Sequence, residues 1–354
     1  MSTPKIALSP VPTRRTLEIT LAAVVALSAV VIFWSQQRYP ALLKKYHAGA
    51  GVKVAGAISF DALLKVTPDM PAQKRIARTS VNWLYTNRFG MYFALPFGAA
   101  MMTLFASTKP KRFGTAAGNV FFGAVAGAPL GVCTNCATPV AQGLLVGGAS
   151  TRMTLAAMIS SPSFNPVVLA MAFVLFPMKL ALMRVAAPLI VMLLLPWIVA
   201  ENEPKAVSFA LAMPHEAVGE RIAAFVKAYS KNLLRLAVLT LPWMLLAAVI
   251  GAAVAELVPA YGTHVPVSLA GVVAVAVLGT LLPLPMALDV ALAYVLYRSN
   301  VPTPYVAALL CTLGPVSVYS LSAMGRELGA KTSVKLAGVV ALLGVAAGVV
   351  AMVS

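Results

Sequence analysis

Long apolar runs alternate with short polar stretches along almost the whole chain. Nine runs are predicted as helices, at roughly residues 16–34, 91–107, 114–132, 153–176, 180–199, 236–256, 267–282, 303–322 and 335–353. A helix needs about 20 mostly apolar residues to cross a bilayer. Backbone groups in lipid must be hydrogen-bonded within their own segment, and these runs are too long for barrel strands. The pattern therefore predicts an all-α, polytopic membrane protein of about 8–10 transmembrane helices.

The composition strengthens this prediction. Of the 354 residues, 60% are hydrophobic and 10% are charged, whereas a soluble domain carries about 25% charged residues. The net charge is +17, and nine of the 27 Lys and Arg residues lie between positions 35 and 90. In a membrane protein, basic segments face the cytoplasm and anionic headgroups. We therefore expect contact with the lipid bilayer and none with nucleic acid, while the charges leave the orientation open.

The first apolar run resembles a signal peptide, but it ends in FWSQQRYP without a small-residue cleavage site. We predict a retained transmembrane helix within residues 1–35. Residues 36–90 are interpreted as a basic amphipathic loop at the membrane interface, anchored by Trp83 and Tyr85. The remaining predicted units are a first transmembrane repeat at 91–200, a connecting loop at 201–235 and a second repeat at 236–354.

Prolines recur in the same order in the two halves of the chain. The pairs are separated by 146, 154 and 153 residues, and they are Pro96 with Pro242, Pro129 with Pro283, and Pro162 with Pro315. Helix-breaking prolines at matching places in two repeats are typical of secondary transporters, whose substrate site lies where the discontinuous helices meet. Proline is common in membrane helices in any case, but three ordered pairs favour two structural repeats. Whether the repeats are inverted or parallel stays open.

Two of the three cysteines, Cys133 and Cys136, lie three positions apart in the segment GVCTNCATPVAQ. An odd number of cysteines argues against a framework of structural disulfides. Pro139 has no N–H and disfavours helix at the preceding residue, which predicts free carbonyls near the cysteines. Two thiolates at this spacing on a turn can bind one soft metal or metalloid, or each other. Packing is the alternative, because cysteine is a small residue that cores accept.

Other polar residues within apolar runs join this candidate site. Thr134 and Asn135 separate the two cysteines, and we expect both to line the substrate path. The segment SSPSFNP contains Ser161 and Asn165, each directly before a proline, which indicates either a hinge inside a span or an ordinary turn outside the membrane. Cys311 precedes Pro315 in the second repeat and would supply a third thiol to a trivalent metalloid if the two repeats face each other.

Asp289 is flanked by long apolar runs on both sides. A carboxylate inside a membrane is energetically expensive and is a functional-site hypothesis by default. We predict that Asp289 binds the proton or cation that couples transport. The alternative is that it pairs with Arg298.

These motifs resemble a known family. The chain is similar to the ArsP-type permeases, predicted permeases that include organoarsenical exporters. They carry a Cys-containing motif before a proline, then a Gly-Leu-Leu, a Gly-Ala-Ser-like turn and a Pro-x-x-Asn-like break. The matching residues here are Cys133, Pro139, Gly143 to Leu145, Gly148 to Ser150, Pro162 and Asn165. The resemblance covers roughly residues 91–354.

One position departs from the family pattern. The family usually carries Cys-x-Cys-Gly before its proline, whereas Asn135 stands here at the second cysteine and Cys136 at the glycine. An arsenical substrate is what the resemblance implies, and the residues themselves leave the substrate open.

Two function classes remain. The favoured one is a secondary transporter in the bacterial cytoplasmic membrane that moves a small solute, such as a metalloid or organometalloid, by alternating access. The alternative is a transmembrane thiol–disulfide electron carrier, in which Cys133 alternates between a thiol and a disulfide with Cys136 or Cys311. The sequence has no phosphate-binding loop, no metal spacing among its three histidines and no catalytic triad. We therefore expect neither an enzyme nor a cofactor; the sequence does not predict the oligomeric state.

Overall fold

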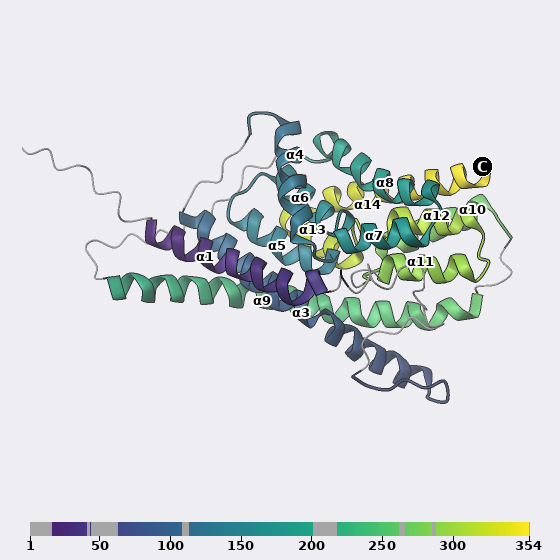
Figure 1. The fold of residues 1–354 in the computed structure, drawn as a ribbon, viewed down its shortest axis with the longest axis horizontal. Coiled ribbons are helices and arrows are strands. Elements are labelled where there is room, and N and C mark those ends of the chain that lie inside the picture. Colours follow the sequence, from purple (N-terminus) through teal and green to yellow (C-terminus); the bar gives the residue numbers. More distant parts are fainter. Residues whose placement is uncertain are drawn as a thin grey trace, which may run out of the picture.

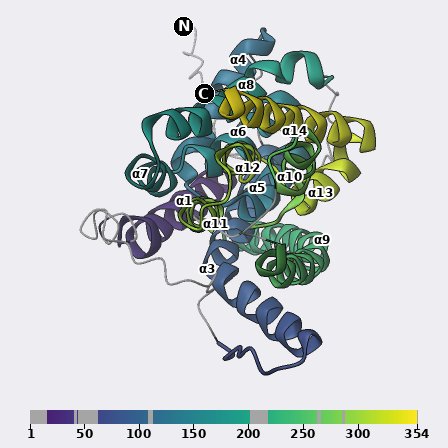
Figure 2. The same ribbon diagram turned by 90° about the vertical axis from the view of Figure 1, so that its right-hand side faces the viewer.

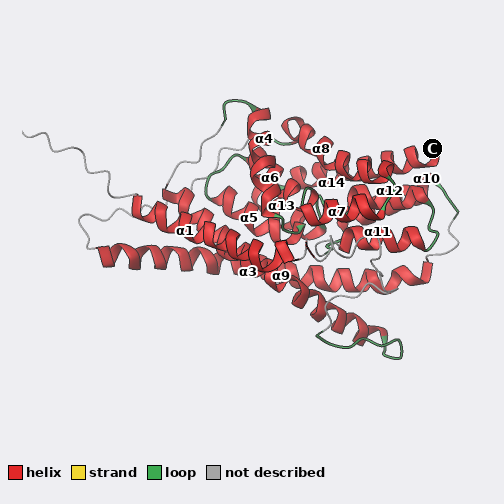
Figure 3. Cartoon of the chain, viewed as in Figure 1, coloured by secondary structure: helices red, strands yellow, loops and turns green. Residues whose placement is uncertain are grey.

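The described part of the chain consists of helices and the turns and loops between them (Figure 3). The computed structural model describes residues 16–40, 43, 63–107, 113–200, 218–261, 266–284 and 288–353. Its α-helices are α1 (Thr16–Phe33), α3 (Ala72–Ser107), α4 (Ala116–Gly127), α5 (Thr134–Val146), α6 (Thr151–Ser163), α7 (Pro166–Leu175), α8 (Met178–Ile198), α9 (Val218–Tyr261), α10 (Leu269–Leu281), α11 (Leu288–Arg298), α12 (Thr303–Thr312), α13 (Val318–Leu328) and α14 (Ala330–Val353). A π-helix, η1 (Trp34–Arg38), continues α1, and a 3-10 turn, η3 (Ala128–Leu130), follows α4. The prediction of an all-α fold is confirmed.

Fewer helices are long and apolar enough to cross a membrane than the apolar runs predict. In the described residues, four helices are long and apolar enough to span a bilayer, or five if α6 and α7, which meet at 47°, count as one. The expected number was about 8–10. The reason is that prolines and glycines divide several apolar runs into helices of 10 to 13 residues, such as α4, α5, α6 and α7. At 1.5 Å per residue, each covers about half a bilayer.

The helices form two series with the same order of long and short elements. The first runs from α3 to α8 and the second from α9 to α14, each with a long helix, four short helices and a helix of 21 or 24 residues. In the first series α4 and α6 pack on each other and on α8, and in the second α10 and α12 pack on each other and on α14. This order agrees with the predicted repeats, which stay a prediction.

The segment expected to lie at the interface contains the first half of a long helix. Residues 72–90 belong to α3, whose beginning projects away from the rest of the bundle (Figure 2). Trp83 is not an interfacial anchor, because its side chain is fully buried and its Nε1 donates to the Pro283 carbonyl at 3.1 Å. The start of α9 likewise occupies residues 218–235 of the expected connecting loop, whose residues 201–217 lie outside the described part.

Glycines bring helices close together around the middle of the molecule. A Cβ at Gly123 or Gly127 of α4 would meet the backbone of α6, and one at Gly143 of α5 would lie 3.0 Å from the Cα of Gly98 in α3. Small residues at such spacing allow close backbone contact in lipid.

Helix α9 runs along almost the whole long axis of the molecule, with α5 in one half and α11 in the other (Figure 1). The short helices therefore meet inside the bundle.

Candidate functional site

The two neighbouring cysteines lie at the beginning of α5. Cys133 is the N-cap residue and Cys136 is in the first turn, so their sulfur atoms approach to 3.2 Å. The two thiols are hydrogen-bonded and form no disulfide. Both side chains are buried. The Cys133 thiol lies 3.7 Å from the amide oxygen of Asn87 in α3. The N-terminus of a helix carries a partial positive charge that favours thiolate over thiol. The pair can therefore hold one soft ligand or form a disulfide.

The break between α6 and α7, in the segment SSPSFNP, holds the loop that leads to these cysteines. The hydroxyl of Ser161 accepts a hydrogen bond from the N–H of Val132 at 3.2 Å. Asn165 donates from Nδ2 to the Gly131 carbonyl at 2.7 Å, and its Oδ1 accepts from the N–H of Val167 at 2.9 Å. Gly131 has φ +59°, which favours glycine. Ser161 and Asn165 are fully buried, so SSPSFNP is an internal hinge, and its helical break is confined to residues 164 and 165.

The first turn of α5 also contacts the broken segments of the second series. The Thr134 hydroxyl donates to the carbonyl of Gly314. Asn135 donates from Nδ2 to the Leu284 carbonyl at 3.4 Å and accepts at Oδ1 from the Ser317 hydroxyl at 3.3 Å. Thr134 and Asn135 therefore lie where the breaks after α4, α10 and α12 converge. This convergence is the arrangement in which discontinuous helices form a substrate site.

Pro139 lies inside α5, so the expected interruption of the helix at Thr138 is wrong. The helix continues through Pro139, the sixth residue of α5, at the cost of one backbone hydrogen bond, which membrane helices accept where side chains and neighbouring helices satisfy the freed groups. Residue 139 still cannot donate to the carbonyl of Asn135, whereas the Thr134 carbonyl accepts from the Thr138 hydroxyl at 2.9 Å. The carbonyl of Pro139 faces α3, where a Cβ at Gly98 would lie 2.9 Å from it.

A buried ion pair connects the two series next to this site. Nη2 of Arg184 in α8 lies 2.9 Å from Oδ2 of Asp289 in α11, and neither residue is more than 6% exposed. The alternative that Asp289 pairs with Arg298 is wrong. Gly314, at φ +110°, lies directly against the pair, since a Cβ there would be 2.6 Å from Arg184 Nη2 and 3.1 Å from Asp289 Oδ2. Gly314 therefore touches both the ion pair and Thr134.

Cys311 does not join the other cysteines. Its thiol points to the Met183 carbonyl of α8 at 3.6 Å. Within the described residues, no group of three Cys, His, Asp or Glu side chains could hold a metal ion. The described residues therefore do not bring Cys311 to Cys133 and Cys136, and they give a three-thiol site no support.

Sequence reasoning missed three polar residues of this region. Arg184 is the one charged residue in the apolar run LALMRVAAPLIVMLLLPWI, which is the same signal that identified Asp289. Arg38 and Asn87 belong to segments that were interpreted as interfacial. Nothing local in the sequence separates them from neighbouring polar residues, because only the tertiary fold brings them to α5.

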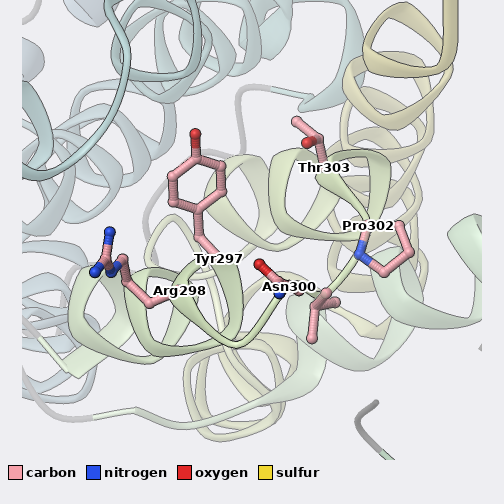
Figure 4. A pocket seen from close by; sticks show the side chains of 6 residues that line it. Tyr297, Arg298, Asn300, Pro302 and Thr303 are labelled. Atoms are coloured by element: carbon pink, nitrogen blue, oxygen red, sulfur yellow. The ribbon is translucent and has the colours of Figure 1, made fainter. Parts of the chain in front are cut away.

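A surface hollow of about 440 Å³ lies at the turn between α11 and α12 (Figure 4). It is lined by Tyr297, Arg298, Asn300, Val301, Pro302 and Thr303. None of the predicted site residues lines it, and we assign it no part in the site.

Comparison with known proteins points to one family. Residues 98–353 match the model of the ArsP_1 family, described as predicted permease. UPF0718 protein YraQ of Escherichia coli (strain K12) is 30% identical over 222 residues, which are 62% of this chain and 64% of that protein, so the chain spans less than two thirds of this relative. No solved structure matches. Since the family match covers more than half of the chain, the protein belongs to the predicted permease family and is a multi-pass membrane protein.

Proposed function

We propose that the protein is a secondary transporter of a small thiol-binding solute, a metalloid or organometalloid, in the bacterial cytoplasmic membrane. One observation carries the proposal. The thiols of Cys133 and Cys136 lie 3.2 Å apart at the start of a half-length helix, and the residues between them bond to the breaks of the second series. A soft ligand bound there would contact both series of helices at once. Movement of one series relative to the other would expose this ligand first to one side of the membrane and then to the other.

The two series of helices support alternating access. Their equal order of elements and equivalent packing partners favour repeats that rock against each other around a fixed site. Cys133 and Cys136 are 5% and 1% exposed. A solute therefore reaches them only when the two series separate on one side.

The chemistry of two thiols suits a trivalent organometalloid. A compound of the type R–As(OH)2 exchanges its two hydroxyl groups for the two sulfur atoms. Two As–O bonds break, two As–S bonds form, and the thiol protons leave with the hydroxyls as two water molecules. No electron is transferred, so the ligand is released by the reverse exchange with water. Asn135 and Thr134 would surround the bound group.

Asp289 is proposed as the coupling residue. Its Oδ1 has no hydrogen-bond partner in the described residues, while Oδ2 binds Arg184. A proton on this carboxylate would weaken the ion pair and alter the environment of Gly314, whose carbonyl accepts from Thr134. The ion pair touches Gly314, and Gly314 accepts a hydrogen bond from Thr134, which lies between the two cysteines.

The test is a titration of the purified protein with phenylarsine oxide, read as a thermal shift. We compare wild type with Cys133→Ser and Cys136→Ser, and we use Cys311→Ser as the matched control because its thiol contacts a different helix. Stabilisation that is lost in the first two variants and kept in the control supports the proposal. Equal stabilisation of all four proteins would overturn it.

The electron-carrier alternative has a different signature. A Cys133–Cys136 disulfide that exchanges reversibly with a thioredoxin-type dithiol would favour it, particularly if no arsenical stabilises the protein. Vesicle flux of the arsenical, with and without a pH gradient, then decides between transport and electron transfer.

A further inference from the structure

Arg38 is a buried cation that lies outside the residues matched to the permease family. The match begins at residue 98, whereas Arg38 ends the π-helix that continues α1. Its side chain is 8% exposed, and its Nε has no hydrogen-bond partner in the described part of the chain. Its guanidinium lies over the ring of Phe33, 4.3 Å from the centroid. A contact with an aromatic face leaves the N–H donors at its edge available.

The π-helix places Arg38 beside the thiol site. Trp34 fixes this segment, because its Nε1 donates to the Pro129 carbonyl at 2.6 Å. A Cβ at Gly131 would lie 3.7 Å both from Cδ of Arg38 and from Nδ2 of Asn165. The guanidinium is also within electrostatic range of Cys133 and Cys136. Short π-helical segments occur frequently at functional sites.

The charges in the interior do not balance. Among the described residues, the buried charged side chains are Arg38, Arg184 and Asp289. Asp289 is bound to Arg184, so Arg38 has no carboxylate partner there. A guanidinium stays charged in proteins, and an unpaired charge inside a membrane protein is costly and marks a functional site. One negative charge would neutralise this region.

The N-terminus of α5 adds to the same preference. The helix has 13 residues, and no side-chain oxygen caps it. By contrast, Asn165 caps α7 and Ser317 caps α13. The positive end of a helix dipole attracts anions. Here it lies beside the thiols that Arg38 also approaches.

We propose that Arg38 and the first turn of α5 bind the anionic group of the transported solute, so that the preferred substrate is a small thiol-binding compound with one negative charge. This inference rests on the proposed function for the role of the thiols. The helix α1 with η1 would then supply a specificity-determining residue that the family-matched region does not contain.

The first arm of the test uses an anion without arsenic. Benzoate is titrated against the rate at which a maleimide labels Cys133 and Cys136. The variants are Arg38→Gln, Arg38→Lys, and the matched control Arg326→Gln, which removes an exposed arginine that also stacks on an aromatic ring, that of Trp243. We expect the half-protecting concentration to rise about tenfold or more in Arg38→Gln. Arg38→Lys should restore most of the protection, and Arg326→Gln should behave as wild type.

The second arm compares two trivalent arsenicals, phenylarsine oxide and its 4-carboxyphenyl analogue, by thermal shift. Wild type should bind the carboxylate analogue about tenfold more tightly, and Arg38→Gln should lose this preference while it keeps phenylarsine oxide. Protection by benzoate with no arsenical binding would overturn the proposed function and leave the anion site standing.

Three results would overturn the anion site. One is equal binding of the two arsenicals by wild type, which decides the question even if Arg38→Gln does not fold. Another is benzoate protection that is unchanged in Arg38→Gln. The last is slower labelling of Cys133 in Arg38→Gln without benzoate and no effect on anion binding, which would make Arg38 the counter-ion of a thiolate.

Discussion

Arg184 and Asp289 are 105 positions apart in the chain, and they form a buried ion pair between α8 and α11 with an Nη2–Oδ2 distance of 2.9 Å. Arg184 belongs to the last helix of the first series and Asp289 to the second. The pair therefore joins the two halves that are proposed to move during transport. Gly314 leaves room for it, because any side chain at that position would meet the guanidinium.

Removing one member of this pair should destabilise the protein strongly. Asp289→Asn leaves the Arg184 guanidinium buried without its counter-charge, and the loss of a single partner typically costs about 3–5 kcal/mol. We expect a large decrease of the unfolding temperature in detergent. The double variant Arg184→Gln/Asp289→Asn should lose less than Asp289→Asn alone, because it leaves no unpaired charge.

Arg298→Gln is the control for this experiment. Arg298 is exposed at the end of α11, so we expect a change within about 0.5 kcal/mol. An Asp289→Asn protein as stable as wild type would show that the pair contributes nothing to the free energy of unfolding. A double variant that is less stable than Asp289→Asn would contradict the charge argument.

The ion pair between Arg75 and Glu256 should make stability depend on pH at the end of the bundle. The Arg75 side chain donates hydrogen bonds to Glu256, which lowers the pKa of that carboxyl below its ordinary value of 4.5 and raises the pKa of Arg75. A carboxyl with a lowered pKa stabilises the fold above its unfolded pKa. This stabilisation is lost as the pH falls through the folded pKa.

Glu256→Gln measures this contribution. The unfolding temperature of wild type should exceed that of the variant at pH 7, and the difference should disappear well below pH 4.5. Both side chains are about a quarter exposed, so the difference should be small and should shrink in high salt. A difference that persists at low pH would mean that packing, and not charge, distinguishes the two proteins.

Local signals in the sequence were sufficient for the all-α fold and for several of the breaks between its helices. Prolines and glycines identified the breaks at Pro129, Pro283 and Pro315, and an isolated acid in an apolar run identified Asp289. Such signals act through the backbone or through the cost of burial, both of which are set by the residue and its immediate neighbours. The thiol pair was likewise visible because its two residues are three positions apart.

Partners distant in sequence were not predictable. Asp289 is closer in sequence to Arg298 than to Arg184, yet Arg184 is its partner, because α8 packs on the second series. Cys311 is placed by α12 against α8 and not against α5, which removed the third thiol. Pro139 misled the prediction, since whether a proline ends a helix depends on the neighbouring groups that satisfy the freed backbone, and these come from the tertiary fold.

The contact of α5 with α3 should not accept a side chain at Gly143. A Cβ there would lie 2.5 Å from the Gly98 carbonyl oxygen and 3.0 Å from its Cα, and a backbone cannot move aside as a flexible side chain can. We expect Gly143→Ala to reduce stability by about 1–3 kcal/mol, the usual cost of overpacking. It should also weaken arsenical binding, because α5 carries the thiols.

Gly338→Ala in α14 is the matched control, since no atom lies within 4 Å of a Cβ at that helical position. Alanine is favoured over glycine in helices by about 0.5–1 kcal/mol, so this variant should be as stable as wild type or more stable. Melting of the two variants in the same detergent gives the comparison. A Gly143→Ala protein that matches Gly338→Ala would contradict the close contact between α3 and α5.

The hydrogen bond from Ser317 to Asn135 allows a direct test of contact between the two series. The Ser317 hydroxyl lies 3.3 Å from Oδ1 of Asn135, and both residues are buried. Asn135→Ala and Ser317→Ala each remove one partner, and the double variant removes both. If the residues interact, the two losses of stability should not add, and their sum should differ from the loss in the double variant by about 0.5–1.5 kcal/mol.

Asn135→Ala should also lower arsenical transport more than Ser317→Ala, because Asn135 lies between the two thiols in the chain while Ser317 only orients it. Additive losses would mean that the two series do not meet through these side chains. Equal transport by Asn135→Ala and wild type would remove Asn135 from the proposed substrate path. The proposal of such a path would then rest on Cys133 and Cys136.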